Sequence, residues 1–280
     1  MPTAHIDETR LRSFLERGFI EVDFDPSLIA AHIPVIQDGM RRLSQDAEAQ
    51  SLFAERTIRT DEVGWKQEAG YVKRTDREYK EYFHHQSLPV AWPDTPTTRR
   101  YADFFDSCGA MTRMAKDLVM AFVAELESVE LIEESDDGLI SSAVARSNAV
   151  TRILRYPPLP EERGNHAEAY AHFDRSFMTV HWWASHEGLA IFDAAGTAHR
   201  VAEQRWDRVA LFPGKKFFGL THGKFGRLGI HGVRDARGTG RSDDRFALVT
   251  FVHAAVSEDE ARMIRDRKSE FDRAEAACQL

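Results

Sequence analysis

Two histidines and one aspartate stand in a pattern that could hold a metal ion. The pattern begins with His172-Phe173-Asp174 and is completed by His231, in the strand-like run 229–233. Because residues i and i+2 of a β-strand project to the same side, His172 and Asp174 can reach one ion that Phe173 cannot. Two neutral imidazoles and one carboxylate leave the opposite face of a metal open, which is typical of non-haem iron that binds O2 and an organic co-substrate together. The sequence therefore predicts one Fe(II) held by His172, Asp174 and His231.

Other histidines in the chain lack this context. The His-x-Asp spacing also occurs at 5–7, but its polar surroundings predict a solvent-exposed segment. The adjacent His84 and His85 are expected at the surface or beside a site, because neighbours in a regular element point in different directions. His222 is the nearest alternative for the third ligand, although the glycine after it is typical of a turn. Without a metal, the pair at 172–174 would be a hydrogen-bonded polar pair at a strand end.

Strands are expected around these residues from position 141 onward. Short apolar runs separated by Gly, Pro, Asp and Glu predict strands at 148–156, 171–183, 189–193, 207–212, 228–233 and 245–253. Upstream, apolar residues at helical spacing predict helices at 7–17, 25–47 and 97–128, with a strand at 19–22. A charged helix is expected at 257–275, with Glu258, Asp259 and Glu260 in its first turn.

This order of elements predicts a mainly β fold with flanking helices. The expected core is a double-stranded β-helix, a cupin-like jelly roll, preceded by an N-terminal helical region. No stretch is typical of an interdomain linker, so we expect a single domain over 1–280. It would comprise a helix-rich part at 1–140, a jelly-roll core at 141–256 and a C-terminal helix at 257–280.

Composition narrows the class of function. The 280 residues are 42% hydrophobic, enough for a sizeable core, and the net charge of −8 argues against a general nucleic-acid binder. Cys108 and Cys278 are the only cysteines, so a reducing, cytoplasmic location fits better than a disulfide framework. Neither a signal peptide nor a membrane-spanning run is recognisable, and the HExxH motif of zinc hydrolases is absent. The oligomeric state is left open.

Several motifs resemble those of a known family in their order and approximate separation. They are Arg152-Ile153-Leu154-Arg155-Tyr156-Pro157-Pro158, His172-Phe173-Asp174, Leu220-Thr221-His222-Gly223, His231 and Arg245-Phe246-Ala247. Over about residues 146–253 the chain resembles the isopenicillin N synthase-like branch of the Fe(II)/2-oxoglutarate-dependent oxygenases. It departs from that family at two positions: His222 stands where Asn is usual, and Ala247 stands where the family has Ser.

The resemblance implies an activity and its cofactors. The chain would use Fe(II), 2-oxoglutarate and O2 to oxidise a small organic molecule, in the first place by hydroxylation, and would release succinate and CO2. One alternative is an isopenicillin N synthase-type oxidase or cyclase that uses no 2-oxoglutarate. A non-enzymatic jelly-roll binding protein is a second alternative, because a fold by itself does not imply a function.

A pocket for the co-substrate is expected beside the metal. Arg245 shares a strand face with Ala247, Val249 and Phe251, and a buried guanidinium on such an apolar face needs a partner. A structural ion pair could supply that partner; the resemblance favours the 2-oxoglutarate carboxylate, which a planar guanidinium can bind through two hydrogen bonds. The expected co-substrate residues are Arg245, Tyr156, Ala247 and Arg152. Residues expected to meet the organic substrate are Asn165, His166, Tyr170, Arg175 and His222.

Overall fold

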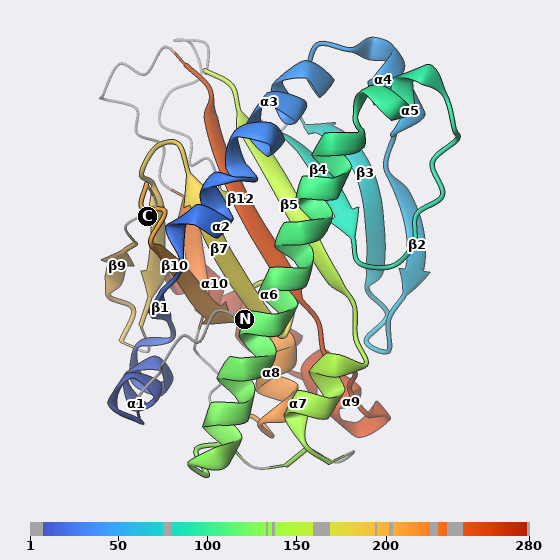
Figure 1. The fold of residues 1–280 in the computed structure, drawn as a ribbon. Coiled ribbons are helices and arrows are strands. Elements are labelled where there is room, and N and C mark those ends of the chain that lie inside the picture. The colour runs from blue at the N-terminus through green and yellow to red at the C-terminus, as the bar shows by residue number, and fades with distance from the viewer. Residues whose placement is uncertain are drawn as a thin grey trace.

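The computed structural model describes most of the chain and places its strands in two antiparallel sheets. The residues described are 8–74, 80–132, 134–135, 138–158, 169–193, 195–201, 204–224, 229–233 and 243–278. The larger sheet has eight strands (Figure 1), in the order β1 (Ile20–Asp23), β10 (Arg208–Pro213), β7 (Met178–Ala184), β12 (Arg245–Val252), β5 (Ala149–Tyr156), β4 (Lys80–Gln86), β3 (Lys66–Arg74) and β2 (Arg56–Thr60). The smaller sheet has four strands, in the order β6 (Ala169–His172), β11 (Ile230–Val233), β8 (Leu189–Phe192) and β9 (Ala198–Arg200). This arrangement confirms the predicted jelly-roll core.

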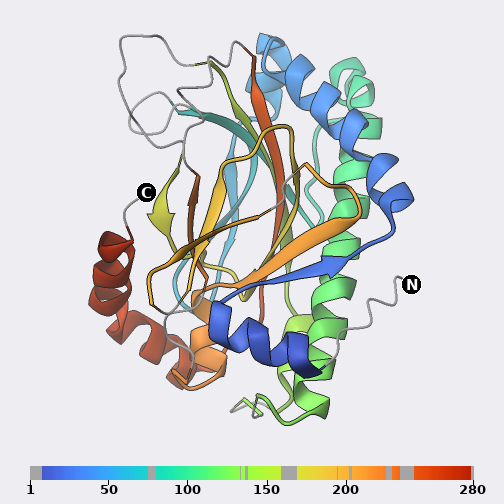
Figure 2. The same cartoon turned by 90° about the vertical axis from the view of Figure 1, so that its left-hand side faces the viewer.

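Helices flank the two sheets. They are α1 (Glu8–Arg17), α2 (Pro26–Ala30), α3 (Ile33–Leu43), α4 (Ala47–Leu52), α5 (Pro96–Arg100), α6 (Ala102–Ser128), α7 (Ile140–Ala145), α8 (Lys215–Leu220), α9 (Glu258–Asp266) and α10 (Lys268–Ala277). The longest, α6, lies with α3 across one face of this sheet, and the C-terminal helices lie on the opposite side of the molecule (Figures 1 and 2). No helix among the described residues is long and apolar enough to cross a membrane.

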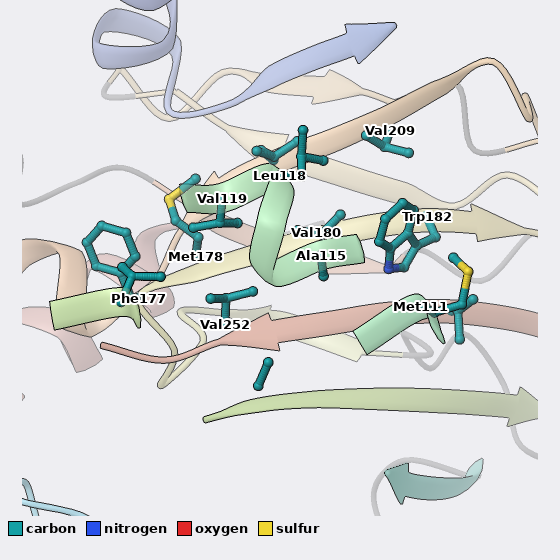
Figure 3. Close-up of a cluster of buried hydrophobic side chains, with 14 of the residues drawn as sticks. Met111, Ala115, Leu118, Val119, Phe177, Met178, Val180, Trp182, Val209 and Val252 are labelled. Atoms are coloured by element: carbon teal, nitrogen blue, oxygen red, sulfur yellow. The ribbon is translucent and has the colours of Figure 1, made fainter. Parts of the chain in front are cut away.

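The main core forms where α6 meets the larger sheet. Apolar side chains repeat at helical spacing along α6 and face alternate residues of the central strands (Figure 3). The labelled side chains of this layer are at most 2% exposed: Met111, Ala115, Leu118, Val119, Phe177, Met178, Val180, Trp182, Val209 and Val252. Burying each large side chain stabilises the fold by about 1.5–3 kcal/mol, so this layer fixes β7 and β12, on which the candidate site depends.

Several predicted elements are divided in the structure. The helix predicted at 25–47 breaks between α2 and α3, where Pro34 occupies the first turn of α3 and cannot continue a preceding helix. The helix predicted at 257–275 is two helices, of which α9 begins with a capping box of Ser257 and Glu260. The region 1–140 was predicted as helix-rich, but it also contributes β1, β2, β3 and β4 to the larger sheet.

The most consequential break lies inside the strand predicted at 171–183. The chain leaves the smaller sheet after His172 and enters the larger sheet at Met178. Between them, the backbone carbonyls of Asp174 and Ser176 accept hydrogen bonds from Lys215 and Lys216 at the start of α8, instead of from a neighbouring strand. His172 and Asp174 therefore lie where the chain passes from one sheet to the other, while His231 lies within β11 of the smaller sheet.

Candidate metal centre

The structure brings the three predicted metal ligands together. His172 ends β6 and is the register partner of His231 on β11, so the two imidazoles are neighbours with ring centroids 4.5 Å apart. Asp174 lies beyond the strand end, and not within a strand as predicted. Its Oδ1 is 3.7 Å from Nε2 of His172, and its Oδ2 is 3.5 Å from Nε2 of His231. One donor atom from each residue lies within 4.8 Å of the others, which is compatible with a single ion between them.

Backbone carbonyls orient both imidazoles. Nδ1 of His172 is 2.7 Å from the carbonyl oxygen of Tyr170, and Nδ1 of His231 is 3.0 Å from that of Gly229. A carbonyl can only accept, so each Nδ1 donates and each Nε2 keeps its lone pair for a metal. Gly229 has a φ of 85°, and a Cβ there would lie 1.9 Å from the carbonyl oxygen of Pro213. Only glycine fits this approach, which aligns β11 and His231.

The protonation states match those of metal ligands. Burial by itself raises the pKa of Asp174, but the nearby imidazoles of His231 and His172 and a hydrogen bond from Thr179, 2.5 Å away, hold that pKa below its usual value. Burial, which Asp174 only partly offsets, lowers the pKa of His231 to about 4. At neutral pH the site therefore presents an ionised carboxylate and, at His231, a neutral imidazole, the forms that bind a divalent metal.

The predicted co-substrate residues line one small cavity with the metal residues. This inner cavity, of about 50 Å³, lies between the two sheets; its wall includes all three metal residues together with Arg152, Tyr156, Arg245 and Ala247. Arg245 of β12 is the register partner of Tyr156 on β5, and its guanidinium carbon lies 5.4 Å from the Tyr156 ring centroid. Arg245 is 1% exposed, and its Nε donates to the carbonyl oxygen of His186. The sequence thus identified a group that the fold brings together.

A larger outer cavity adjoins the inner one. Its volume is about 510 Å³, and it shares Lys80, Arg152, His172, Asp174 and Phe251 with the inner cavity. These shared residues form the junction of the two cavities, so the outer cavity leads directly to the predicted metal.

Of the residues predicted to contact the substrate, two line a cavity, one does not, and two cannot be described. Tyr170 and Arg175 line the outer cavity. His222 does not belong with them, because it lies on the exposed turn after α8, with φ 49°, and lines neither cavity. A local sequence match could not reveal that this turn faces away from the cavities. Asn165 and His166 lie outside the described residues.

Sequence reasoning missed several residues of the site. Thr179 donates a hydrogen bond to Asp174, but it belongs to no sequence motif that would have pointed to this contact. His84 was expected at the surface or beside a site; it is 6% exposed, lines the outer cavity and accepts a hydrogen bond from Arg152. The run Lys80–Gln86 shows no alternation of polar and apolar residues, so the sequence offered no periodic signal that His84 faces a cavity.

Solved oxygenase structures share this fold, whereas no protein-family model and no curated protein matches the chain. A candidate oxygenase from Shewanella oneidensis is 20% identical with a TM-score of 0.68, covering 94% of each chain. A full-length Neurospora crassa protein, solved in complex with alpha-KG and 5-formyluracil, is 17% identical with a TM-score of 0.66 over 90% of this chain and 84% of that chain. An Arabidopsis thaliana dioxygenase for auxin oxidation, solved with 2-oxoglutarate, is 17% identical with a TM-score of 0.65 over 91% of each chain.

Proposed function

We propose that this protein is a non-haem Fe(II)- and 2-oxoglutarate-dependent oxygenase that hydroxylates a small organic molecule. The observation that carries the proposal is the meeting of His172, Asp174 and His231 at one wall of a cavity that also holds Arg245 opposite Tyr156. The shared fold adds support, because structures with this fold were solved with 2-oxoglutarate or alpha-KG bound.

The metal would be held by the Nε2 atoms of His172 and His231 and a carboxylate oxygen of Asp174. Two neutral imidazoles and one carboxylate suit Fe(II) and leave room for other ligands. When bound, Fe(II) supplies the redox chemistry by which O2 oxidises the substrate while 2-oxoglutarate is converted to succinate and CO2. The carbonyls of Tyr170 and Gly229 hold the imidazoles in the orientation this requires.

The co-substrate would extend into the inner cavity toward Arg245. Its far carboxylate would meet the Arg245 guanidinium and the Tyr156 hydroxyl, while Ala247 contributes a methyl group where the resembling family has a hydroxyl. Apolar walls from Leu154, Phe212 and Val249 exclude water around this contact and strengthen its electrostatic part.

The substrate would enter through the outer cavity, past Tyr170 and Arg175. The cytoplasm remains our proposal for location, supported by the two free cysteines, Cys108 and Cys278, both buried as thiols.

Anaerobic titration with Fe(II) and 2-oxoglutarate tests the proposal. The expected result is a visible metal-to-ligand charge-transfer band that saturates at one Fe(II) per chain, followed by succinate release when O2 is admitted with a suitable substrate. A protein that binds Fe(II) without this band and turns over without 2-oxoglutarate would instead be a synthase-type oxidase.

A further inference from the structure

Arg152 places a positive charge at the junction of the two cavities. It lies on β5, is only partly buried and lines both the inner and the outer cavity. The carboxylates of Glu55 and Asp174 are near enough for the Arg152 charge to act on their pKa values, and Glu55 lies 3.6 Å from Nδ1 of His84. Even so, no carboxylate among the described residues lies within ion-pair distance of the Arg152 guanidinium. Arg155, on the other face of the same strand, makes such contacts: its Nη1 lies 2.8 Å from Glu81 and its Nε lies 2.8 Å from Asp244. The two arginines have opposite environments, and only Arg152 faces the site.

The Arg152 side chain is held in place from three sides. Its Nε donates to Nε2 of His84 at 2.6 Å, and its guanidinium carbon lies 5.1 Å from the Tyr82 ring centroid and 4.7 Å from that of Phe251. Burial and the neighbouring Arg152 charge lower the pKa of His84, so its imidazole stays neutral and can accept this bond. The bond uses one of the five N–H donors of the guanidinium, and no other hydrogen bond joins Arg152 to the described residues.

Arg152 is poorly placed to share the co-substrate with Arg245. Tyr156, the register partner of Arg245, is four residues along β5 from Arg152, roughly 13 Å at the usual rise per residue. A dicarboxylate bound to the metal at one end has one far carboxylate, and Arg245 meets it deep in the inner cavity. Arg152 also faces the outer cavity, beside His172 and Asp174. A second anionic ligand accounts for this position better than 2-oxoglutarate does.

We propose that Arg152 binds a carboxylate of the organic substrate and that His84 is the residue that positions it. The inference rests on the proposed function, because it places the substrate in the outer cavity beside the metal. Most of the cavity lining is polar, but the aromatic side chains of Tyr82, Phe173 and Phe251 beside Arg152 and the metal residues would contact an apolar part of the substrate. Arg152 thereby becomes a specificity residue in place of the co-substrate role predicted from sequence.

Calorimetric titration with matched carboxylates and amides tests this assignment. The probes are phenylacetate, phenylpropionate and octanoate, each compared with its primary amide, on protein loaded with Mn(II) and 2-oxoglutarate so that no turnover occurs. A charge-assisted contact predicts that at least one carboxylate binds about ten- to a hundredfold more tightly than its amide. Arg152→Gln should remove this preference, while Arg152→Lys should retain part of it.

Three further variants separate a direct contact of Arg152 with the carboxylate from a general effect of charge. Arg175→Gln removes the same charge at the exposed mouth of the outer cavity and should change the carboxylate-to-amide ratio less than threefold. His84→Leu should lower the ratio by releasing Arg152, while His84→Gln, which keeps an acceptor, should restore it. Thermal unfolding of each variant checks that the fold is intact.

Three results would overturn the assignment. They are the absence of a carboxylate preference in every pair, a preference that survives Arg152→Gln, and an equal loss in Arg175→Gln. Titration with 2-oxoglutarate separates this failure from failure of the proposed function. Arg152→Gln should leave 2-oxoglutarate affinity within about twofold, and a loss as large as in Arg245→Gln would make Arg152 a co-substrate residue. If wild type binds no 2-oxoglutarate, the proposed function fails, whether or not the carboxylate preference is found.

Discussion

The buried ion pair between Asp61 and Lys216 connects the outer cavity to the C-terminal half of the chain. The Lys216 ammonium lies 3.1 Å from Oδ2 of Asp61, and their side chains are 1% and 0% exposed. Lys216 also donates to the carbonyl oxygen of Ala254. The other oxygen of Asp61, Oδ1, accepts from the backbone nitrogens of Val63 and Trp65, so this carboxylate also shapes the turn that carries Trp65 to the cavity wall.

Asp61→Asn isolates the charge of this pair. The amide keeps an oxygen for the two backbone donors but leaves the Lys216 ammonium buried beside a neutral group. Breaking a buried pair in this way costs about 3–5 kcal/mol of unfolding free energy. Glu62, half exposed and 3.6 Å from the same ammonium, offsets part of the loss. We therefore expect about 3 kcal/mol, measured as a lower denaturant midpoint with an unchanged slope.

Two control variants test whether the unpaired buried charge of Lys216 causes the expected loss of stability. Asp259→Asn removes a carboxylate from an exposed pair with Arg262, whose side chains are 69% and 62% exposed, and should cost less than about 1 kcal/mol. In the double variant Asp61→Asn with Lys216→Met, removal of the stranded cation should recover part of the stability. An equal effect of Asp61→Asn and Asp259→Asn, or no recovery in the double variant, would refute the reasoning.

Three further predictions concern the site and its neighbours. His231→Ala should abolish Fe(II) binding in equilibrium dialysis, while His222→Ala, on an exposed turn, should leave it unchanged; the reverse pattern would exclude His231 as a ligand. Arg245→Gln should weaken 2-oxoglutarate binding about ten- to a hundredfold in the anaerobic titration, and equal binding would make Arg245 structural. Burial lowers the pKa of His253 to about 3. Between that value and the ordinary pKa, His253 is protonated in the unfolded state and neutral in the folded state. The resulting stability is present above the ordinary histidine pKa of 6.5 and is lost as pH falls toward 3. His253→Asn should reduce the pH slope of the unfolding free energy in that window by up to about 1.4 kcal/mol per pH unit, and an unchanged slope would contradict it.

The sequence by itself predicted the three residues that meet in the candidate metal centre and several residues of the cavity beside it. Alternation along a strand put His172 and Asp174 on one side, and the strand-like run at 229–233 put His231 on a separate strand. The same alternation put Arg245 and Ala247 on one face of their strand, now seen at the inner cavity. The placement of Arg245 and Ala247 succeeded because side-chain direction in a strand is a local property with a period of two residues. Asp174 meets His172 although it lies beyond the end of β6, so the strand alternation predicted for this pair does not explain their meeting.

Tertiary structure decided which distant residues meet at the site. The break after His172 depends on hydrogen bonds from the start of α8, which periodicity within the strand could not reveal. His84 reaches Arg152 because β4 is the neighbour of β5 in the sheet, with those two residues in register. The partner of Lys216 is Asp61, far away in the N-terminal part of the chain, and no local pattern links them. Local spacing encodes the face that a residue occupies, but only the order of strands in the sheets and the packing of helices against them decide what that face contacts.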